Sequence, residues 1–201
     1  MSRPFVVLIA GGTASGKTTL CRKLVEKTGA LLITHDRYYC DIPHPRGFNF
    51  DHPDALDTAR LEADVDALCS GVSTDLPVYD FATHSRTDQT ERVDSGSLIV
   101  VEGILVLQSL RLVRAASLIV YVDTPDDIRL VRRIRRDISE RGRTVDSVLD
   151  QYLGTVRPMH RAFVESTRDR ARLVLDGTRE PTQLLDELMD EMRRSGWVSE
   201  K

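Results

Sequence analysis

A glycine-rich segment close to the N-terminus has residue types and spacing that could bind phosphate. The spacing GxxxxGK[ST] is satisfied by Gly11, Gly12, Thr13, Ala14, Ser15, Gly16, Lys17 and Thr18, and Thr19 follows. Glycines allow backbone N–H groups to surround phosphate oxygens, and the N-terminus of the following helix favours an anion. In such a P-loop the lysine contacts the β- and γ-phosphates and the threonine hydroxyl ligates Mg²⁺. The alternative is a glycine-rich turn without function, which the flanking strand and helix patterns disfavour.

Two acidic residues directly follow predicted strands and could hold a metal ion or accept a proton. Glu102 ends the apolar run 98–101, and Asp36 comes shortly after the run 31–34. Carboxyl ends of parallel strands meet at one edge of a sheet, so we expect both carboxylates near the phosphate loop. Glu102 fits a Walker B acid, and with Thr18 and Asp36 it forms the predicted Mg²⁺ site. The alternative for either acid alone is a solvated or capping carboxylate.

Arginines recur at helical spacing in the second half of the chain. They lie within one arc of about 100° on a helical wheel: Arg129, Arg132, Arg133 and Arg136. Because apolar residues fill the opposite arc, we expect the helix to pack through its apolar face and to present the arginines. That apolar face consists of Leu130, Val131, Ile134 and Ile138. Planar guanidinium groups match the charge that develops in phosphoryl transfer, which favours an arginine lid over an ordinary solvated helix face.

Short apolar runs alternate with helical patterns along the chain. The predicted strands are residues 5–10, 31–34, 98–101, 118–122 and 173–175. The predicted helices are residues 18–27, 58–68, 125–140, 145–169 and 181–194. Continuous apolar runs are typical of strands covered on both faces. The alternation predicts a doubly wound α/β fold with a five-stranded parallel sheet and right-handed crossovers.

Helix ends and two irregular segments complete this pattern. Thr124 and Pro125 are expected to cap the arginine helix, and Gly29, Gly71 and Gly196 to end helices. Segments 35–53 and 76–95 do not fit the alternation; the second has a short-strand pattern with polar tips. Ligands bind beyond the carboxyl ends of parallel strands, so these insertions are candidates for an acceptor pocket.

Composition limits the class of protein. The 201 residues fit one domain, 1–201, with 41% apolar and 29% charged residues. A formal net charge of -3 disfavours a nucleic-acid partner. The cysteines, Cys21, Cys40 and Cys69, have no CxxC spacing and indicate a reduced, cytoplasmic environment. We expect no signal peptide and no membrane span, because the longest apolar candidate, 98–107, is interrupted by Glu102.

An ordered series of motifs from about residue 5 to 174 resembles the uridine-cytidine kinases, P-loop enzymes that phosphorylate the ribose 5′-hydroxyl of pyrimidine nucleosides. The motifs are GGTASGKTT, HDRYY, FNFDHPDALD, LPVYDF with HSR, VVEGILVL, YVDTPDDIRL, RRDISERGR and QYLGTVRPMH. The resemblance implies a P-loop NTP hydrolase fold, with 35–53 and 76–95 as nucleoside-binding insertions and 133–151 as the lid region. The chain departs from the family at Arg37, where a small residue is common, and after the last strand at 176–179.

The resemblance also implies roles for individual residues. Asp36 would be the catalytic base, and Lys17, Arg136 and Arg141 would act on the phosphates. The implied nucleoside-binding residues are Asp51 on the ribose hydroxyls, Arg133 and Gln151 on the nucleoside, and Tyr79, Phe81, His84 and Arg143 around the pyrimidine, with Tyr39 and Ile104 in the same set.

The implied reaction is phosphorylation of uridine and cytidine by ATP, giving UMP or CMP and ADP in pyrimidine salvage. Mg²⁺ is the implied cofactor, GTP is an alternative donor, and a homotetramer is the implied assembly. Another small-molecule P-loop kinase, acting on pantothenate or ribulose phosphate, is the first alternative. A non-catalytic nucleotide-binding switch is a second, which the predicted acid pocket, the arginine lid and the lack of an NKxD motif disfavour.

Overall fold

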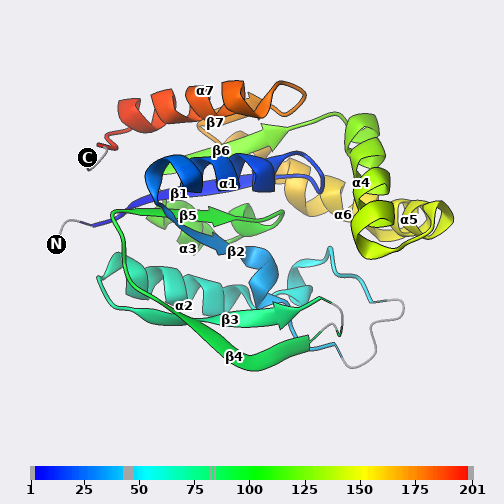
Figure 1. Ribbon diagram of the computed structural model, residues 1–201, viewed down its shortest axis with the longest axis horizontal. Helices are drawn as coiled ribbons and strands as arrows, with labels where there is room; N and C mark the ends of the chain where they lie inside the picture. The colour runs from blue at the N-terminus through cyan, green and yellow to red at the C-terminus, as the bar shows by residue number, and fades with distance from the viewer. Residues whose placement is uncertain (1–2, 43–47, 82, 84, 199–201) are drawn as a thin grey trace.

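A parallel sheet forms the centre of the computed structural model, which describes residues 3–42, 48–81, 83 and 85–198. Its strands are β1 (Phe5–Gly11), β2 (Leu31–Thr34), β5 (Leu98–Glu102), β6 (Leu118–Asp123) and β7 (Leu173–Asp176). They lie in the order β2-β5-β1-β6-β7, and every pairing is parallel (Figure 1). The predicted five-stranded doubly wound sheet is confirmed.

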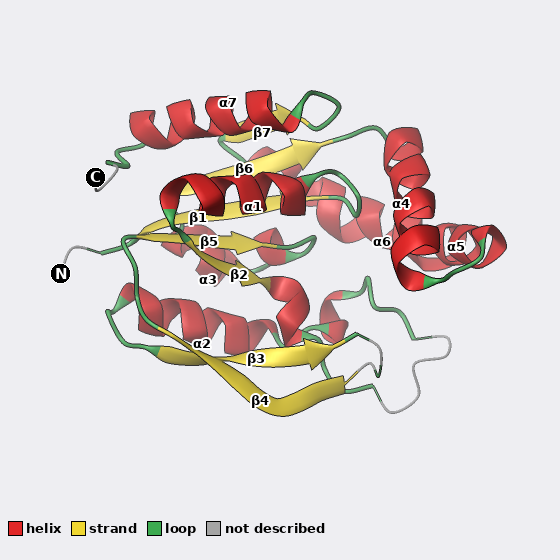
Figure 2. Cartoon of the chain, viewed as in Figure 1, coloured by secondary structure: helices red, strands yellow, loops and turns green. Residues whose placement is uncertain are grey.

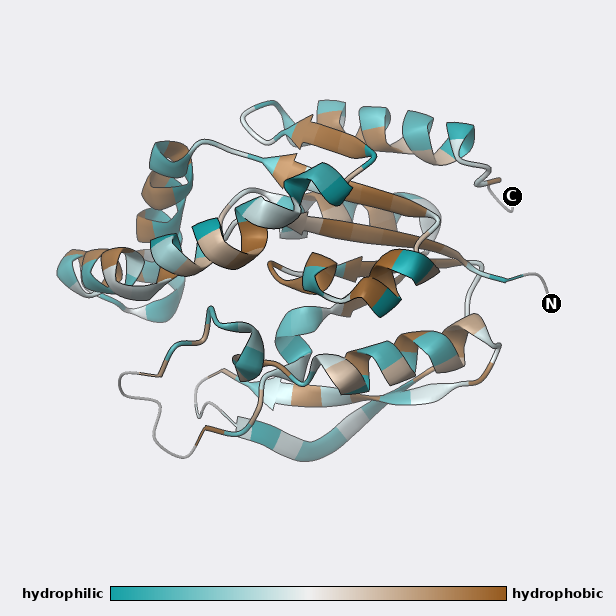
Figure 3. Cartoon of the chain, turned by 180° about the vertical axis from the view of Figure 1, so that it is seen from behind, coloured by the Kyte–Doolittle hydropathy of each residue, from teal (hydrophilic) through white to brown (hydrophobic). Residues whose placement is uncertain are grey.

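Successive residues of the central strands contribute to two apolar cores on opposite faces of the sheet. In β1, Val6 and Leu8 belong to one core, whereas Val7 and Ile9 belong to the other. Side chains alternate across a strand, so a strand covered on both faces must be apolar throughout. Figure 3 shows this apolar character along the parallel strands. The continuous apolar runs in the sequence therefore follow directly from the two-sided burial.

Helices cover both faces of this sheet (Figure 2). On one face, α1 (Lys17–Thr28) and α7 (Pro181–Arg194) supply Leu20, Leu24 and Leu188 to the core. On the other face, α2 (Thr58–Cys69) and the short α3 (Leu110–Ala115) supply Leu61 and Leu112. The predicted helices 18–27, 58–68 and 181–194 agree with α1, α2 and α7 to within about one residue at each end, whereas α3 was not predicted. No described helix combines the length and apolar character that a membrane crossing requires.

The register of the sheet places three strand ends at the same edge. Glu102, the last residue of β5, pairs with Ile9 of β1 and with Thr34 of β2. The phosphate loop begins directly after β1, and Asp36 lies in the 3₁₀ helix His35–Tyr38 that follows β2. A common edge for the loop and the two acidic residues is what the sequence predicted.

A separate antiparallel hairpin packs beside α2. It consists of β3 (Thr74–Asp80) and β4 (Ser85–Val93), with an irregular register between Pro77 and Tyr79. The predicted short strands over 76–95 therefore form one hairpin that starts two residues earlier. Arg37 joins it to the 3₁₀ helix after β2, donating from Nε to the carbonyl of Pro77 at 2.9 Å and from Nη2 to Glu91 at 2.6 Å.

Helix α4 (Asp126–Arg141) projects beyond the edge of the sheet (Figure 1). It packs through the face opposite to the one predicted. Arg129 and Arg133 are only 2% and 5% exposed, whereas Val131 and Ile138 are 48% and 42% exposed. The prediction that this helix packs through its apolar face is wrong. Past the edge of the sheet the helix meets polar groups of the phosphate loop and of the next helix, so its arginine face is the one that packs.

The start of α4 also differs from the prediction. Pro125 occupies the N-cap position, and no side chain caps the first turn. Thr124 is not the cap, because its hydroxyl donates to the carbonyl of Ser15 in the phosphate loop at 3.0 Å. The expected glycine stops are confirmed elsewhere: Gly29, Gly71 and Gly196 have φ of 69°, 79° and 94° after helices α1, α2 and α7.

The single helix predicted over 145–169 is a series of different helical turns. α5 (Val145–Gln151) continues into the π-helical turn Tyr152–Val156, and α6 (Arg157–Met159) into a second one, His160–Val164. The 3₁₀ helix Glu165–Arg170 ends the segment. Pro158 lies between the two wide turns and has no N–H to donate, which disfavours a regular α-helix.

Candidate functional site

The phosphate loop has a tightly bent backbone between β1 and α1. Gly11, Ala14 and Gly16 have positive φ values of 142°, 58° and 103°. A Cβ atom on Gly11 would lie 2.4 Å from the carbonyl oxygen of Val122, so only glycine fits there. Lys17 begins α1, and its buried Nζ donates to the carbonyl of Gly12 at 2.9 Å. The lysine ammonium thus lies across the loop, at the position where phosphate oxygens enter such a site.

Side chains and backbone groups from three other segments pack against this loop. A Cβ atom on Gly12 would lie 2.5 Å from Nη1 of the buried Arg129, whose Nε donates to the carbonyl of Thr124 at 3.0 Å. A Cβ atom on Gly177 would lie 2.1 Å from Oγ1 of Thr124. Arg132 donates to the carbonyl of Gly177 at 2.9 Å. Any side chain at Gly12 or Gly177 would displace the groups that hold the loop.

Two carboxylates and one ammonium interact at the edge of the sheet. Burial raises the pKa of Glu102, and Lys17 partly opposes that shift. Burial likewise raises the pKa of Asp36, against the opposing charges of Lys17, Arg141 and Arg136. Burial lowers the pKa of Lys17, while Glu102 and Asp36 oppose this effect. The structure therefore brings together Asp36, Glu102 and Lys17, with Arg136 and Arg141 close enough to act on Asp36.

The acidic residues and Thr18 fit a metal ion that is held partly by the protein and partly by the phosphates of a substrate. The hydroxyl of Thr18 donates to Oε1 of Glu102 at 3.2 Å, so the first two predicted ligands lie side by side. Within the described part of the chain, no group of three or more His, Cys, Asp or Glu side chains is placed to hold a metal. Mg²⁺ typically binds one or two carboxylates together with substrate phosphates and water. Thr18, Glu102 and Asp36 are suited to that mode and not to a cage made by protein alone.

Arg133 and Arg143 meet at Gln151, as the sequence predicted for a common site. Arg133 donates to Oε1 of Gln151 at 2.8 Å and to the hydroxyl of Thr13 at 3.2 Å. Arg143 donates to the same Oε1 atom. Burial raises the pKa of Asp51, and the charge of Arg133 is the largest opposing effect. Asp51, Arg133, Arg143 and Gln151 therefore belong to one polar cluster beside the phosphate loop.

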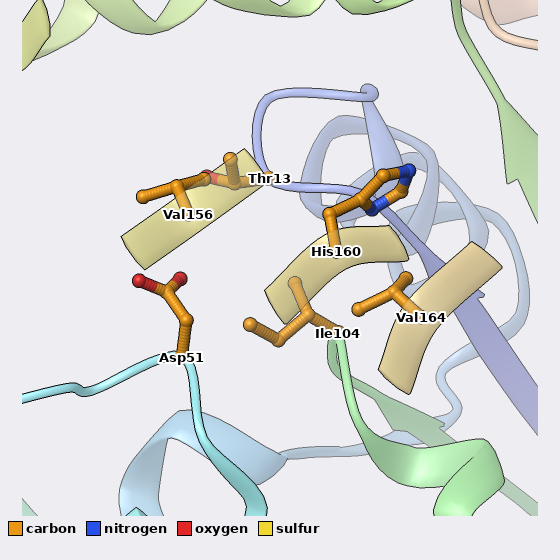
Figure 4. A pocket seen from close by; sticks show the side chains of 6 residues that line it. All are labelled: Thr13, Asp51, Ile104, Val156, His160 and Val164. Carbon is orange, nitrogen blue, oxygen red and sulfur yellow. The ribbon is translucent and has the colours of Figure 1, made fainter. Parts of the chain in front are cut away.

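A small pocket connects this cluster to the phosphate loop. Asp51 lies at its rim, with Thr13 of the loop and Ile104 from the segment after β5 (Figure 4). The helical segment after α5 supplies Val156, His160 and Val164. The two π-helical turns contain all three of these residues. The hydroxyl of Thr155, in the first of these turns, also donates to Asp51 at 3.4 Å. The irregular helix that the sequence did not predict thus forms one wall of the site.

Aromatic rings line the side of the site formed by the insertions. Tyr39 and Tyr79 have ring centroids 5.5 Å apart, and Tyr79 and Phe81 are in edge contact at 5.1 Å. Phe50 packs edge-on against Tyr39 at 5.7 Å. Asp36 and Asp51 both contribute to raising the pKa of Tyr39, after burial, which places this ring close to both carboxylates. The remaining predicted residue, His84, lies outside the described residues.

Several residues of the site were not predicted individually. His160 lines the pocket, Thr155 bonds Asp51 at its rim, and Phe50 packs against Tyr39. Arg86 donates to the carbonyls of Tyr38 and Tyr39 at 3.1 and 3.0 Å. All four lie within or next to the motifs FNFDHPD, HSR and QYLGTVRPMH. Motif membership was therefore a usable signal, whereas helical periodicity was not, because two of the four lie in π-helical turns.

Comparisons with known proteins agree on one family. Residues 6–184 match the model of the "Phosphoribulokinase / Uridine kinase family". The chain is 50% identical over 182 residues to a uridine kinase of Chloroflexus aurantiacus, covering 87% of each chain. It is 43% identical over 183 residues to a uridine kinase of Clostridium novyi, covering 87% of this chain and 88% of the other. The solved D-glycerate 3-kinase of Cryptococcus neoformans shares the fold, with a TM-score of 0.62 at 15% identity over 90% of this chain and 88% of that one.

The buried histidine of the pocket predicts a loss of stability in acid. Burial, together with the charge of Arg129, lowers the pKa of His160 to about 4 from 6.5. Between pH 6.5 and pH 4, His160 is therefore protonated in the unfolded chain but neutral in the folded chain. The contribution of neutral His160 to the free energy of unfolding is fully present above pH 6.5 and is lost as the pH falls towards 4. A pKa shift of that size corresponds to about 3 kcal/mol of unfolding free energy. We expect His160→Gln to reduce the loss of unfolding free energy between pH 7 and pH 4, measured by urea unfolding.

A pH dependence that His160→Gln leaves unchanged would show that His160 is protonated in the folded state.

Proposed function

The chain belongs to the phosphoribulokinase/uridine kinase family, and on that basis we propose that it transfers the γ-phosphate of ATP to the 5′-hydroxyl of uridine or cytidine, giving ADP and UMP or CMP. The observation that carries this proposal is the position of Asp36. It lies at one edge of the sheet with Lys17 and Glu102 on one side and, through Tyr39, the Asp51 cluster on the other. That position is suited to a group acting between a nucleotide phosphate and an acceptor hydroxyl.

On the donor side, the P-loop and the arginines would hold the phosphates. The backbone of residues 11–16 and the ammonium of Lys17 are suited to the β- and γ-phosphates. Thr18 and Glu102, and Asp36 beyond them, would hold Mg²⁺, which when bound neutralises charge between the phosphates. Arg136 and Arg141 would stabilise the charge that develops on the transferred group.

In the proposed transfer, Asp36 accepts the proton of the 5′-hydroxyl as that oxygen bonds to the γ-phosphorus. The bond from the γ-phosphorus to the bridging oxygen breaks, and its electron pair leaves with ADP. Burial raises the pKa of Asp36 from its ordinary value, which makes its carboxylate a better proton acceptor. Lys17, Arg141 and Arg136 oppose this shift and favour the ionised carboxylate.

On the acceptor side, each part of the site is suited to one part of a nucleoside. The carboxylate of Asp51 would accept hydrogen bonds from the ribose hydroxyls. Tyr39, Tyr79 and Phe81 offer ring surfaces for the pyrimidine, with Ile104 at the inner end of the pocket and His84 as a further contact. Arg133, Arg143 and Gln151 would complete the nucleoside site and form part of a lid over 133–151.

Other properties of the proposal come from the sequence and from the resemblance to the family. They are one kinase domain over 1–201, nucleoside-binding insertions at 35–53 and 76–95, a homotetramer, and a cytoplasmic role in pyrimidine salvage. GTP is the alternative donor. A member of the family that acts on pantothenate or ribulose phosphate is the competing proposal, and it would share the donor side but not the aromatic insertion.

A substrate panel with product identification tests the proposed function. The protein with Mg²⁺ and ATP should convert uridine and cytidine to the 5′-monophosphates and should leave pantothenate and ribulose 5-phosphate unchanged. Lys17→Ala should remain folded but inactive, because Lys17 is proposed to act on phosphate. Absence of a nucleoside monophosphate together with turnover of another acceptor would transfer the proposal to that substrate.

Replacing the proposed base tests the mechanism. Asp36→Asn keeps the size of the side chain and one oxygen but cannot take the proton. We expect kcat to fall by at least about a hundredfold while uridine and Mg-ATP still bind by calorimetry. In the unsubstituted protein kcat should decline in acid, with an apparent pKa above the usual 3.8 of aspartate, because burial raises the pKa of Asp36. An Asn variant that kept most of its kcat would assign the role to Glu102, and Glu102→Gln would be measured next.

Deoxyribonucleosides test the role given to Asp51. Without the 2′-hydroxyl, the half-buried Asp51 would keep one unsatisfied acceptor, which typically costs 1–3 kcal/mol, or roughly 5- to 150-fold. We expect kcat/KM for 2′-deoxyuridine to be lower than for uridine by about that factor. Asp51→Asn should reduce the difference. Equal efficiency on both nucleosides in the unsubstituted protein would remove Asp51 from ribose recognition.

A further inference from the structure

One carboxylate that the proposed reaction does not use lies among the lid arginines. Asp137, on the inward face of α4, is fully buried, with a relative exposure of 0%. Its side chain forms ion pairs with Arg133, Arg136, Arg141 and Arg143. A buried charge is strongly destabilising unless it is paired, so these contacts account for its burial. They also join all the arginines that are proposed to touch a substrate.

The two oxygens of Asp137 divide these arginines into two pairs. Oδ1 accepts from Nε and Nη2 of Arg136 at 2.9 and 2.8 Å, and Nη1 of Arg141 lies 3.4 Å from it. Oδ2 lies 3.5 Å from Nε of Arg133 and 3.6 Å from Nη1 of Arg143. The first pair is the one proposed to act on the phosphates, and the second is the one proposed to hold the nucleoside. A single carboxylate therefore lies between the two substrate sites.

The contacts of the two oxygens are unequal. Arg136 is in hydrogen-bond distance of Oδ1, whereas Oδ2 and Nε of Arg133 have no hydrogen-bond partner in the part of the chain that the structure describes. Arg133 and Arg143 are instead held by Gln151. Charge-assisted hydrogen bonds to Oδ1 thus compete directly with any phosphate that approaches Arg136 and Arg141.

The charges around Asp137 do not cancel. Asp137 pairs with four guanidinium groups, and the carboxylates of Asp36 and Asp51 also act on three of them. Four positive charges thus face three negative ones, an excess that an entering phosphate would reduce. If Arg136 and Arg141 move from Oδ1 to phosphate, Asp137 loses its closest partners. Its negative charge is then free to attract Arg133 and Arg143. If these two arginines move closer to Asp137, the nucleoside side of the site becomes more ordered. By the same reasoning, ordering of that side by a nucleoside would release Arg136 and Arg141 from Asp137.

We propose that Asp137 is a positioning residue that couples binding of the nucleoside to binding of the nucleotide, through exchange of its arginine partners. This inference rests on the proposed function, which assigns one arginine pair to each substrate. A purely structural carboxylate would hold α4 in place but would not make either substrate affect the affinity for the other.

Calorimetry on the full chain can separate these roles. The dissociation constant of a non-hydrolysable ATP analogue with Mg²⁺ is measured with and without saturating uridine. In the unsubstituted protein we expect uridine to tighten nucleotide binding by roughly fivefold or more, the lower end of typical coupling between sites. In Asp137→Asn, which keeps the shape but not the charge, the ratio should fall close to one.

A second readout distinguishes loss of coupling from damage to the site. Asp137→Asn should bind the nucleotide alone as tightly as the unsubstituted protein or more tightly, because Arg136 and Arg141 no longer leave a carboxylate to reach phosphate. Structural damage would weaken that binding. Glu140→Gln is the matched control, since Glu140 is an exposed acid on the same helix. It should keep the full effect of uridine.

The outcomes distinguish this inference from the function on which it rests. Failure of the unsubstituted protein to phosphorylate uridine would reject the proposed function. Normal turnover with no effect of uridine on nucleotide affinity, or with an effect that Asp137→Asn retains, would overturn the inference alone. If Asp137→Asn does not fold, Arg141→Gln is used, because the Arg141 side chain is 52% exposed and its loss removes one partner of Oδ1. A full effect of uridine in that variant would equally overturn the inference.

Discussion

The register of three adjacent parallel strands is the constraint on which the rest of the site depends. Because Glu102 pairs with both Ile9 and Thr34, the chain leaves β1, β2 and β5 at one edge of the sheet. The phosphate loop, the 3₁₀ helix with Asp36 and the end of β5 therefore share one small region. A shift of one residue in the register would turn the side chain of Glu102 to the other face of the sheet. The two apolar cores oppose such a shift, since it would exchange the residues that they bury.

Partial burial then determines the chemical character of the charges at this edge. Loss of water is the first cause of the raised pKa of Asp36 and Glu102 and of the lowered pKa of Lys17. In each case the opposite charges nearby oppose the shift and favour the ionised form. Such a region has charges that are incompletely balanced and already held in place. An anionic substrate that binds with its metal ion would balance these charges, and the side chains would have to move little to receive it.

The orientation of α4 shows how a local pattern can be correct and its interpretation wrong. The helix exists and its arginines share one face, as the periodicity indicated. The usual rule that the apolar face packs inward fails, because α4 lies beyond the sheet and has no apolar core to meet there. Arg129 packs against Gly12, Arg133 bonds Thr13 and Gln151, and Asp137 pairs with Arg136 and Arg141. The packing of α4 therefore depends on paired charges and hydrogen bonds and not on apolar contacts.

The sequence by itself determined the five parallel strands, the phosphate loop and the position of two acids at the strand ends. These features depend on local spacing and on the common direction of the strands, so one chain is enough to predict them. Only the tertiary structure decided which face of α4 is buried, that 145–169 contains π-helical turns, and that Asp137 lies between two arginine pairs. Those outcomes depend on which surfaces meet across the fold, and periodicity along a single helix contains no information about its neighbours.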